Sequence, residues 1–176
     1  PGTEIKMVPS RDDITVPMDD ILAQINENTA LVVLSHVSFK SSYLYDMRAI
    51  TQQAHKYGAL VLWDVSHSAG ALRVDLGECE VDLAVGCSYK YLNGGPGAPA
   101  FLYVRKDHQG QLLNPISGWF GHDAPFDFST GYRPAEDINR FLTGTPPVTS
   151  IALIEPGIDI ILETGIDQIR EKSVKQ

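Results

Sequence analysis

Three short apolar runs, each ending in polar residues, constrain the fold of this chain more than any other feature. They are Ala30–Leu34, Ala59–Trp63 and Leu83–Cys87. Each run is too short for a typical helix and is rich in aliphatic side chains, which predicts three strands. The first run is β-branched and continuous, so we expect that strand to be buried on both faces.

A helix is expected between the first two strands. Apolar residues recur there at helical spacing, at Met47, Ile50, Ala54 and Tyr57. Asp46 is suited to the N-cap, and Gly58 stands where a left-handed residue ends a helix without steric penalty. Strand, helix and strand form a βαβ unit, so the two strands are expected to be parallel and joined by a right-handed crossover.

The rest of the chain continues this α/β pattern. After a Gly- and Pro-rich turn, Phe101–Val104 follows the third strand so closely that we expect it to be antiparallel to that strand. We also expect a helix over Pro17–Asn28, a long ordered loop over 106–147, and a final helical stretch from Val148 that breaks or kinks at Pro156. The predicted fold class is α/β, a three-layer αβα arrangement with a mostly parallel sheet.

Composition excludes several classes of partner. The chain has 176 residues and a formal net charge of −8, without a basic cluster, which argues against nucleic acid or an anionic membrane surface. No apolar run approaches the roughly 20 residues needed to cross a bilayer. Cys79 and Cys87 match no zinc or redox spacing, which indicates reduced thiols in a cytoplasmic protein. The five histidines show no metal-ligand spacing, so no metal is expected.

Polar residues follow each of the three runs, at Ser35, at 64–67 and at 88–90. Ligands of open parallel sheets bind just beyond the carboxyl ends of the strands, so these positions are candidate site residues. A buried ion pair between Asp64 and Lys90 would explain two of them without any ligand. Lys90, however, lies between two tyrosines and just before a tight Gly- and Pro-rich turn, which favours a functional amine.

Asp64–His67 (DVSH), with Lys90 26 residues after Asp64, resembles the cofactor-binding core of class V, fold type I pyridoxal-phosphate (PLP) enzymes. The similarity is greater to the kynureninase family. It rests on Tyr89–Asn93 (YKYLN), Gly118–His122 (GWFGH) and Gly144–Pro147 (GTPP), in this order and spacing. The likeness extends from about Ile14 to the end of the chain.

This resemblance implies pyridoxal 5'-phosphate as the cofactor and assigns each site residue a role. Lys90 would bond to the cofactor aldehyde and Asp64 would keep the ring nitrogen protonated. The remaining cofactor contacts implied are Ser35, His67, Tyr89, Trp119 and Thr145. His67 would bind near the phenolic oxygen, and Tyr89, Trp119 and Thr145 near the phosphate. In a homodimer that shares its sites, Trp119 and Thr145 are the candidates to come from the second subunit.

The implied reaction is hydrolysis of L-kynurenine or 3-hydroxykynurenine to anthranilate or 3-hydroxyanthranilate and L-alanine, in tryptophan degradation. Freed Lys90 would remove the α-proton, and Tyr89 would relay a proton to the β-carbon. The resemblance also implies that residues 1–176 are the central part of the large PLP-binding domain, with 148–176 leading toward a small domain. We therefore expect the 176-residue chain alone to be inactive.

Other interpretations of the same residues stay open. Another class V enzyme, such as an aminotransferase, fits the same core. A cysteine desulfurase fits less well, because it needs a nucleophilic cysteine well after the lysine. A non-catalytic α/β module is also possible on the residues alone, with His67 or Thr145 as a cap, Trp119 as a packing residue and Ser35 bonded to the backbone. The G-x-G-x-x-A pattern at 95–100 precedes a strand rather than a helix, so it does not indicate a dinucleotide site.

Overall fold

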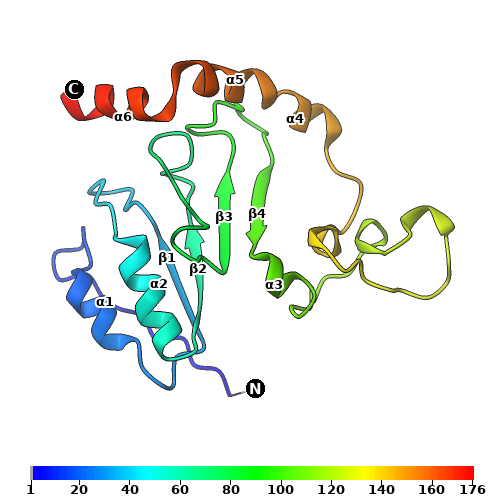
Figure 1. Cartoon of the computed structure of the whole chain (residues 1–176), viewed down its shortest axis with the longest axis horizontal. Helices are drawn as coiled ribbons and strands as arrows, with labels where there is room; N and C mark the ends of the chain where they lie inside the picture. The colour runs from blue at the N-terminus through cyan, green and yellow to red at the C-terminus, as the bar shows by residue number, and fades with distance from the viewer. Residues whose placement is uncertain (1) are drawn as a thin grey trace.

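The computed structural model describes residues 2–176 and contains a four-stranded sheet (Figure 1). Its strands lie in the order β1 (Leu31–Ser35), β2 (Leu60–Asp64), β3 (Leu83–Cys87) and β4 (Ala100–Val104). The first three are parallel to one another, and β4 is antiparallel to β3. The predicted strands and their directions are therefore confirmed, with each bound shifted by no more than one residue.

Helices precede, separate and follow these strands. They are α1 (Met18–Gln24), α2 (Met47–Lys56), α3 (Lys106–Gln109), α4 (Val148–Ala152), α5 (Glu155–Thr164) and α6 (Ile166–Lys175), with 3-10 turns η1 (Trp119–Gly121), η2 (Pro125–Asp127) and η3 (Ile138–Phe141). Asp46 caps α2 by accepting a hydrogen bond from the Ala49 N–H, and Gly58 follows the helix with a φ of +75°. Both predicted end signals of α2 are confirmed.

Two helix ends differ from the prediction. α1 ends at Gln24 rather than near Asn28, because a turn follows in which the Thr29 N–H donates to the Asn26 carbonyl and the Asn26 N–H donates to the Thr29 hydroxyl. The break expected at Pro156 is confirmed: α4 ends at Ala152, and Pro156 lies in the first turn of α5, where its missing N–H is not needed. A second break, at Gly165 with a φ of +83°, was not predicted.

The core lies between one face of the sheet and helices α1 and α2. Val61, Trp63 and Ala84 project from that face and are fully buried against Ile50 and its neighbours on α2. The Trp63 indole N–H donates to the Thr51 hydroxyl at 3.1 Å, so its buried polar group is satisfied. This contact joins the middle of α2 to the carboxyl-terminal half of β2.

The opposite face of the sheet is open within residues 2–176. Leu31 is 47% exposed and Val33 63% exposed, so the prediction that the first strand is buried on both faces is wrong for this chain. Alternate side chains of a strand point to opposite faces, and Val32 and Leu34 are the two that pack toward the helices. No helix of the described residues covers the other face.

The α/β class and the mostly parallel sheet are confirmed. Of the three layers expected, the described residues supply the sheet and the helical layer of α1 and α2. Helices α5 and α6 lie instead beyond the edge at the carboxyl ends of the parallel strands, and α4 lies beyond β4 (Figure 1). In α5, Gly157 packs so closely on Leu92 that a Cβ would lie 2.7 Å from the Leu92 carbonyl oxygen. The C-terminal helices therefore contact the chain that follows β3.

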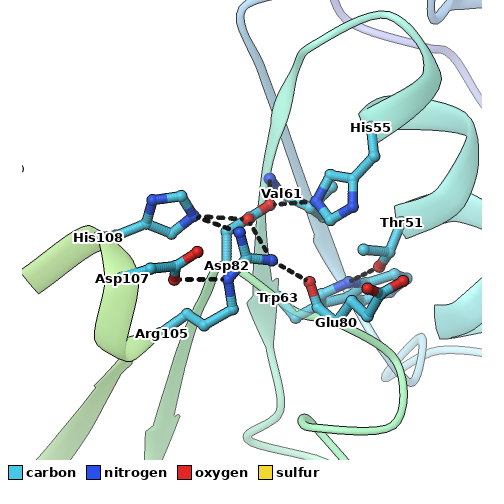
Figure 2. Close-up of polar contacts among 9 residues, drawn as sticks. All are labelled: Thr51, His55, Val61, Trp63, Glu80, Asp82, Arg105, Asp107 and His108. Carbon is cyan, nitrogen blue, oxygen red and sulfur yellow. Dashed lines mark hydrogen bonds and ion pairs between the residues drawn. The ribbon is translucent and has the colours of Figure 1, made fainter.

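A buried ionic cluster holds the amino end of β3, opposite the edge that carries the predicted site. Figure 2 shows its centre, Asp82, which is 0% exposed and has its carboxylate bonded on several sides. His55 from α2 lies 2.8 Å away, His108 from α3 2.8 Å and Arg105 3.0 Å, and the Val61 N–H donates at 2.9 Å. Burial raises the pKa of Asp82, but the hydrogen bonds from His55, His108 and Val61 outweigh it and lower the pKa below the usual value.

Candidate cofactor site at the carboxyl ends of the strands

The parallel register brings the predicted strand-end residues to one edge of the sheet. Ser35 is the register partner of Asp64 across β1 and β2, and Asp64 is the partner of Val85 across β2 and β3. The His36 N–H donates to the Asp64 carbonyl at 2.9 Å, so pairing continues one residue past β1. Ser35 and Asp64 are therefore neighbours, as predicted.

Lys90 reaches this edge from the segment that follows β3. Its Nζ lies 2.9 Å from His67 Nε2 and 5.5 Å from the centre of the Tyr89 ring. Within residues 2–176 no ion pair joins Lys90 to Asp64, so the alternative of a structural ion pair between them is not what the structure shows. Lys90 is partly buried, and the direct partner of its amine is an imidazole rather than a carboxylate.

The turn after β2 positions His67. Asp64 Oδ1 accepts the Ser66 N–H at 2.8 Å, which fixes the first residues of the turn. Gly70 closes it with a φ of +85°, and a Cβ there would lie 2.4 Å from the Tyr91 carbonyl oxygen. The turn that carries His67 and the loop that carries Lys90 are thus packed backbone to backbone, and only glycine permits that approach.

A tight loop also fixes Lys90 from its other side. The Asn93 N–H donates to the Lys90 carbonyl at 3.1 Å, and the Gly94 N–H donates to the Ser88 carbonyl at 2.9 Å. Asn93 has a φ of +59°, a conformation that asparagine tolerates better than most residues. Lys90 therefore extends from a closed loop, which limits where its amine can lie.

Beside the site, His36 is buried without a full set of hydrogen bonds. It is 6% exposed, its Nδ1 has no partner in the described residues, and its ring meets Trp63 edge to face at 5.7 Å. Burial lowers the pKa of His36 from 6.5 to about 4. The imidazole is therefore neutral near pH 7 and adds no charge to this edge of the sheet.

Two predicted site residues lie elsewhere in this chain. Trp119, in η1, is 45% exposed and contacts Phe120 and Phe126 edge to face, in the segment beyond β4 (Figure 1). Thr145 is exposed just before α4; the N-cap of that helix is Pro147, without a side-chain hydrogen bond, so Thr145 does not cap it. The structure thus brings Ser35, Asp64, His67, Tyr89 and Lys90 to one edge, and leaves Trp119 and Thr145 apart from it.

One side chain at this edge was missed from the sequence. The Phe39 ring stacks on the His67 ring, with centroids 6.5 Å apart and planes 28° apart, although Phe39 is 75% exposed. Its position after the first strand is the signal that could have indicated it, because loops at carboxyl ends of parallel strands surround the ligand.

No helix in residues 2–176 is long and apolar enough to cross a membrane. In the same part of the chain, no group of three or more His, Cys, Asp or Glu side chains is placed to hold a metal ion.

Comparison with known proteins places this geometry in a family. The class-V aminotransferase model matches residues 1–176. Kynureninase from Burkholderia mallei (strain SAVP1) is 43% identical over 171 residues, which are 97% of this chain and 39% of that protein. Kynureninase from Pseudomonas fluorescens is 44% identical over 156 residues, which are 89% of this chain and 38% of that protein. The chain therefore spans about two-fifths of these relatives. An apo cysteine desulfurase from Thermococcus onnurineus NA1 shares the fold, with a TM-score of 0.78 and 24% identity over 94% of this chain and 40% of that one. The chain belongs to the class-V aminotransferase family.

Proposed function

We propose that the protein containing this chain is a PLP-dependent hydrolase that cleaves L-kynurenine, or its 3-hydroxy form, into an anthranilate and L-alanine. The observation that carries the proposal is the placement of Lys90, whose amine lies 2.9 Å from His67 at the strand edge that also holds Asp64. Identity of 43% to a kynureninase over nearly the whole chain supports this substrate in particular. Cytoplasmic location is part of the proposal and agrees with the free thiols of Cys79 and Cys87.

The side chains at the edge fit the cofactor. Lys90 has no carboxylate partner in the described residues, so its amine is available to bond to an aldehyde. Among residues 2–176 only Oδ1 of Asp64 accepts a hydrogen bond, which leaves Oδ2 to pair with a protonated ring nitrogen. Ser35 lies beside Asp64 and would contact the same ring. When bound, PLP supplies an electron sink for the carbanion that forms next to the substrate amine.

His67 and Lys90 would move the protons. His67 Nε2, 2.9 Å from Lys90 Nζ, is within reach to take a proton from the lysine ammonium and return it. Lys90 would then remove the substrate α-proton as a neutral amine. Tyr89, whose ring lies 5.5 Å from the Lys90 amine, would deliver a proton to the β-carbon that becomes the methyl group of alanine. Replacement of Tyr89 with Phe should slow turnover while cofactor is retained, and unchanged turnover would remove Tyr89 from the mechanism.

Trp119 and Thr145 would contribute to the cofactor site of a second subunit. Both come after β4 in the chain, and Trp119 is 45% exposed although its ring contacts Phe120 and Phe126. We propose a homodimer in which these residues bind the phosphate in the partner's site. Mixing inactive Lys90→Ala with inactive Trp119→Ala protein should then restore activity at about a quarter of the sites, because one site of each mixed dimer is intact. No recovery after subunit exchange would contradict the shared site.

The reaction is tested with L-kynurenine and the protein expressed from its complete reading frame. Release of fluorescent anthranilate together with equimolar L-alanine, absent from Lys90→Ala protein, is the expected result. Ketoacid-dependent amine transfer without anthranilate would indicate an aminotransferase instead. Sulfide release from cysteine would indicate a desulfurase, and no reaction with bound cofactor would contradict all three activities.

A further inference from the structure

The loop that joins β1 to α2 carries an aromatic side chain to the proposed site. It leaves the sheet at the carboxyl end of β1 (Figure 1) and is closed by an antiparallel bridge between Val37 and Leu44. The Ser38 N–H donates to the Tyr43 carbonyl at 2.9 Å, which makes the loop a small hairpin. Phe39 lies at the start of its tip.

This hairpin is held in place by the segment that precedes α1. Lys40 Nζ donates to the Asp13 carbonyl at 3.0 Å, and the Ser38 hydroxyl donates to the Ile14 carbonyl at 3.3 Å. At its base, the Tyr45 hydroxyl donates to the Val16 carbonyl at 3.2 Å. Anchoring on two sides fixes the position of Phe39 relative to the sheet edge.

The Phe39 ring has one face occupied and the remainder open. It stacks on His67 at 6.5 Å and 28°, and yet 75% of the residue is exposed to solvent. His67 in turn lies 2.9 Å from the Lys90 amine. An open aromatic surface therefore stands one side chain away from the proposed reacting group, and burial of such a surface by a flat apolar ring is favourable.

We propose that Phe39 binds the aromatic ring of the substrate by stacking and thereby selects amino acids with an aryl side chain. This inference rests on the proposed function, and it assigns the aryl half of the substrate to the hairpin and the amino-acid half to Lys90 and Asp64. An electron-rich aminophenyl ring suits an offset or edge-to-face contact with phenylalanine. Phe39 determines specificity and takes no part in proton transfer.

The two products of the proposed reaction each carry one half of the substrate, anthranilate the aryl half and L-alanine the amino-acid half, so the two halves can be tested separately. Isothermal titration of the PLP-loaded protein, from its complete reading frame, measures the affinity for anthranilate and for L-alanine without any turnover. Phe39→Ala and Phe39→Leu should bind anthranilate about 2- to 12-fold more weakly, the range that an aromatic pair contributes, with unchanged affinity for L-alanine. Phe39→Tyr, which keeps the ring, should bind both ligands as the wild type does.

Leu113→Ala serves as a control, because Leu113 is 81% exposed on the chain beyond α3 and should alter neither affinity. Equal weakening of both ligands in Phe39→Ala, or no weakening of either, would overturn the role of Phe39. Unchanged anthranilate affinity in Phe39→Leu would also overturn it, since this would show that the bulk of the side chain matters rather than ring stacking. Anthranilate release from L-kynurenine is measured in parallel: if the wild type releases it while Phe39→Ala binds both products normally, this inference fails and the proposed function stands. If no variant releases anthranilate, the proposed function fails.

Discussion

Removal of the Asp82 carboxylate should destabilise the fold strongly, although Asp82 lies at the edge opposite the proposed site. The side chain is fully buried and accepts hydrogen bonds or ion pairs from His55, His108, Arg105 and the Val61 N–H (Figure 2). Asp82→Ala leaves the buried Val61 N–H without its acceptor and takes the carboxylate away from His55 and His108, whereas Arg105 keeps Asp107 and the Glu80 carbonyl as partners. Breaking a buried charged cluster by removing one member typically costs about 3–5 kcal/mol, and the orphaned Val61 N–H alone accounts for about 1–3 kcal/mol of such a loss.

The free energy of unfolding, from urea titrations followed by circular dichroism and tryptophan fluorescence, measures this loss. Asp107→Ala is the matched control, since Asp107 also bonds to Arg105, at 2.8 Å, but is exposed, so little change is expected. Asp82→Asn should fall between them, because the amide oxygen still accepts one hydrogen bond while its NH2 group faces other donors. Similar small losses in Asp82→Ala and Asp107→Ala would refute the reasoning.

The same cluster predicts the pH dependence of the loss. The folded pKa of Asp82 is lower than its unfolded value of 3.8, so the folded state favours the carboxylate. Its contribution to stability is therefore fully present above about pH 4 and is lost as the pH falls through the lowered folded pKa. The difference between wild type and Asp82→Ala should therefore shrink as the pH falls below about 4. A difference that does not shrink in that acidic range would contradict this assignment.

Two further predictions concern Gly70 and His36, which lie near the site, with Gly58 at the opposite edge of the sheet as a comparison. Gly58 and Gly70 both have a positive φ, but a Cβ at Gly58 would meet nothing within 4 Å, whereas a Cβ at Gly70 would lie 2.4 Å from the Tyr91 carbonyl oxygen. Gly58→Ala should therefore lower the free energy of unfolding by about 1–2 kcal/mol, the cost of the left-handed backbone alone. Gly70→Ala should lower it further and should also weaken cofactor retention. Equal effects in the two variants would show that the close approach is unimportant. His36 has its pKa lowered to about 4 by burial, so the unfolded state binds more protons between pH 6.5 and 4, and stability should fall by up to about 3 kcal/mol as the pH drops through that range. His36→Phe should lose less over the same range, and parallel pH curves would contradict the assignment.

Local signals predicted the elements and the strand-end part of the site. The three apolar runs became β1, β2 and β3 within one residue, since their length and composition depend little on the rest of the molecule. Because parallel strands end at one edge, the positions of Ser35, Asp64 and Lys90 followed from the order of the elements alone. Gly58 and Pro156 ended or began helices for reasons that act within a few residues.

Contacts between distant residues could not be predicted in this way. Asp82 meets His55 and His108 at separations of 27 and 26 residues, and no regular spacing marks those histidines. The sequence pattern of β1 indicated burial but not how much of the sheet this chain covers, so the exposure of Val33 was missed. The contact between Lys90 and His67 joins two separate loops, which also meet where Gly70 packs on Tyr91.

The assignment of Lys90 as the cofactor lysine is tested most directly by chemical trapping. Borohydride reduction of the PLP-loaded protein should fix the cofactor covalently on its lysine, and peptide mapping by mass spectrometry then identifies that residue. We predict the modification on the peptide that contains Lys90, and its loss in Lys90→Arg protein that remains folded. Modification of another lysine such as Lys40 or Lys56, or an unmodified Lys90 in fully loaded protein, would contradict the proposed site.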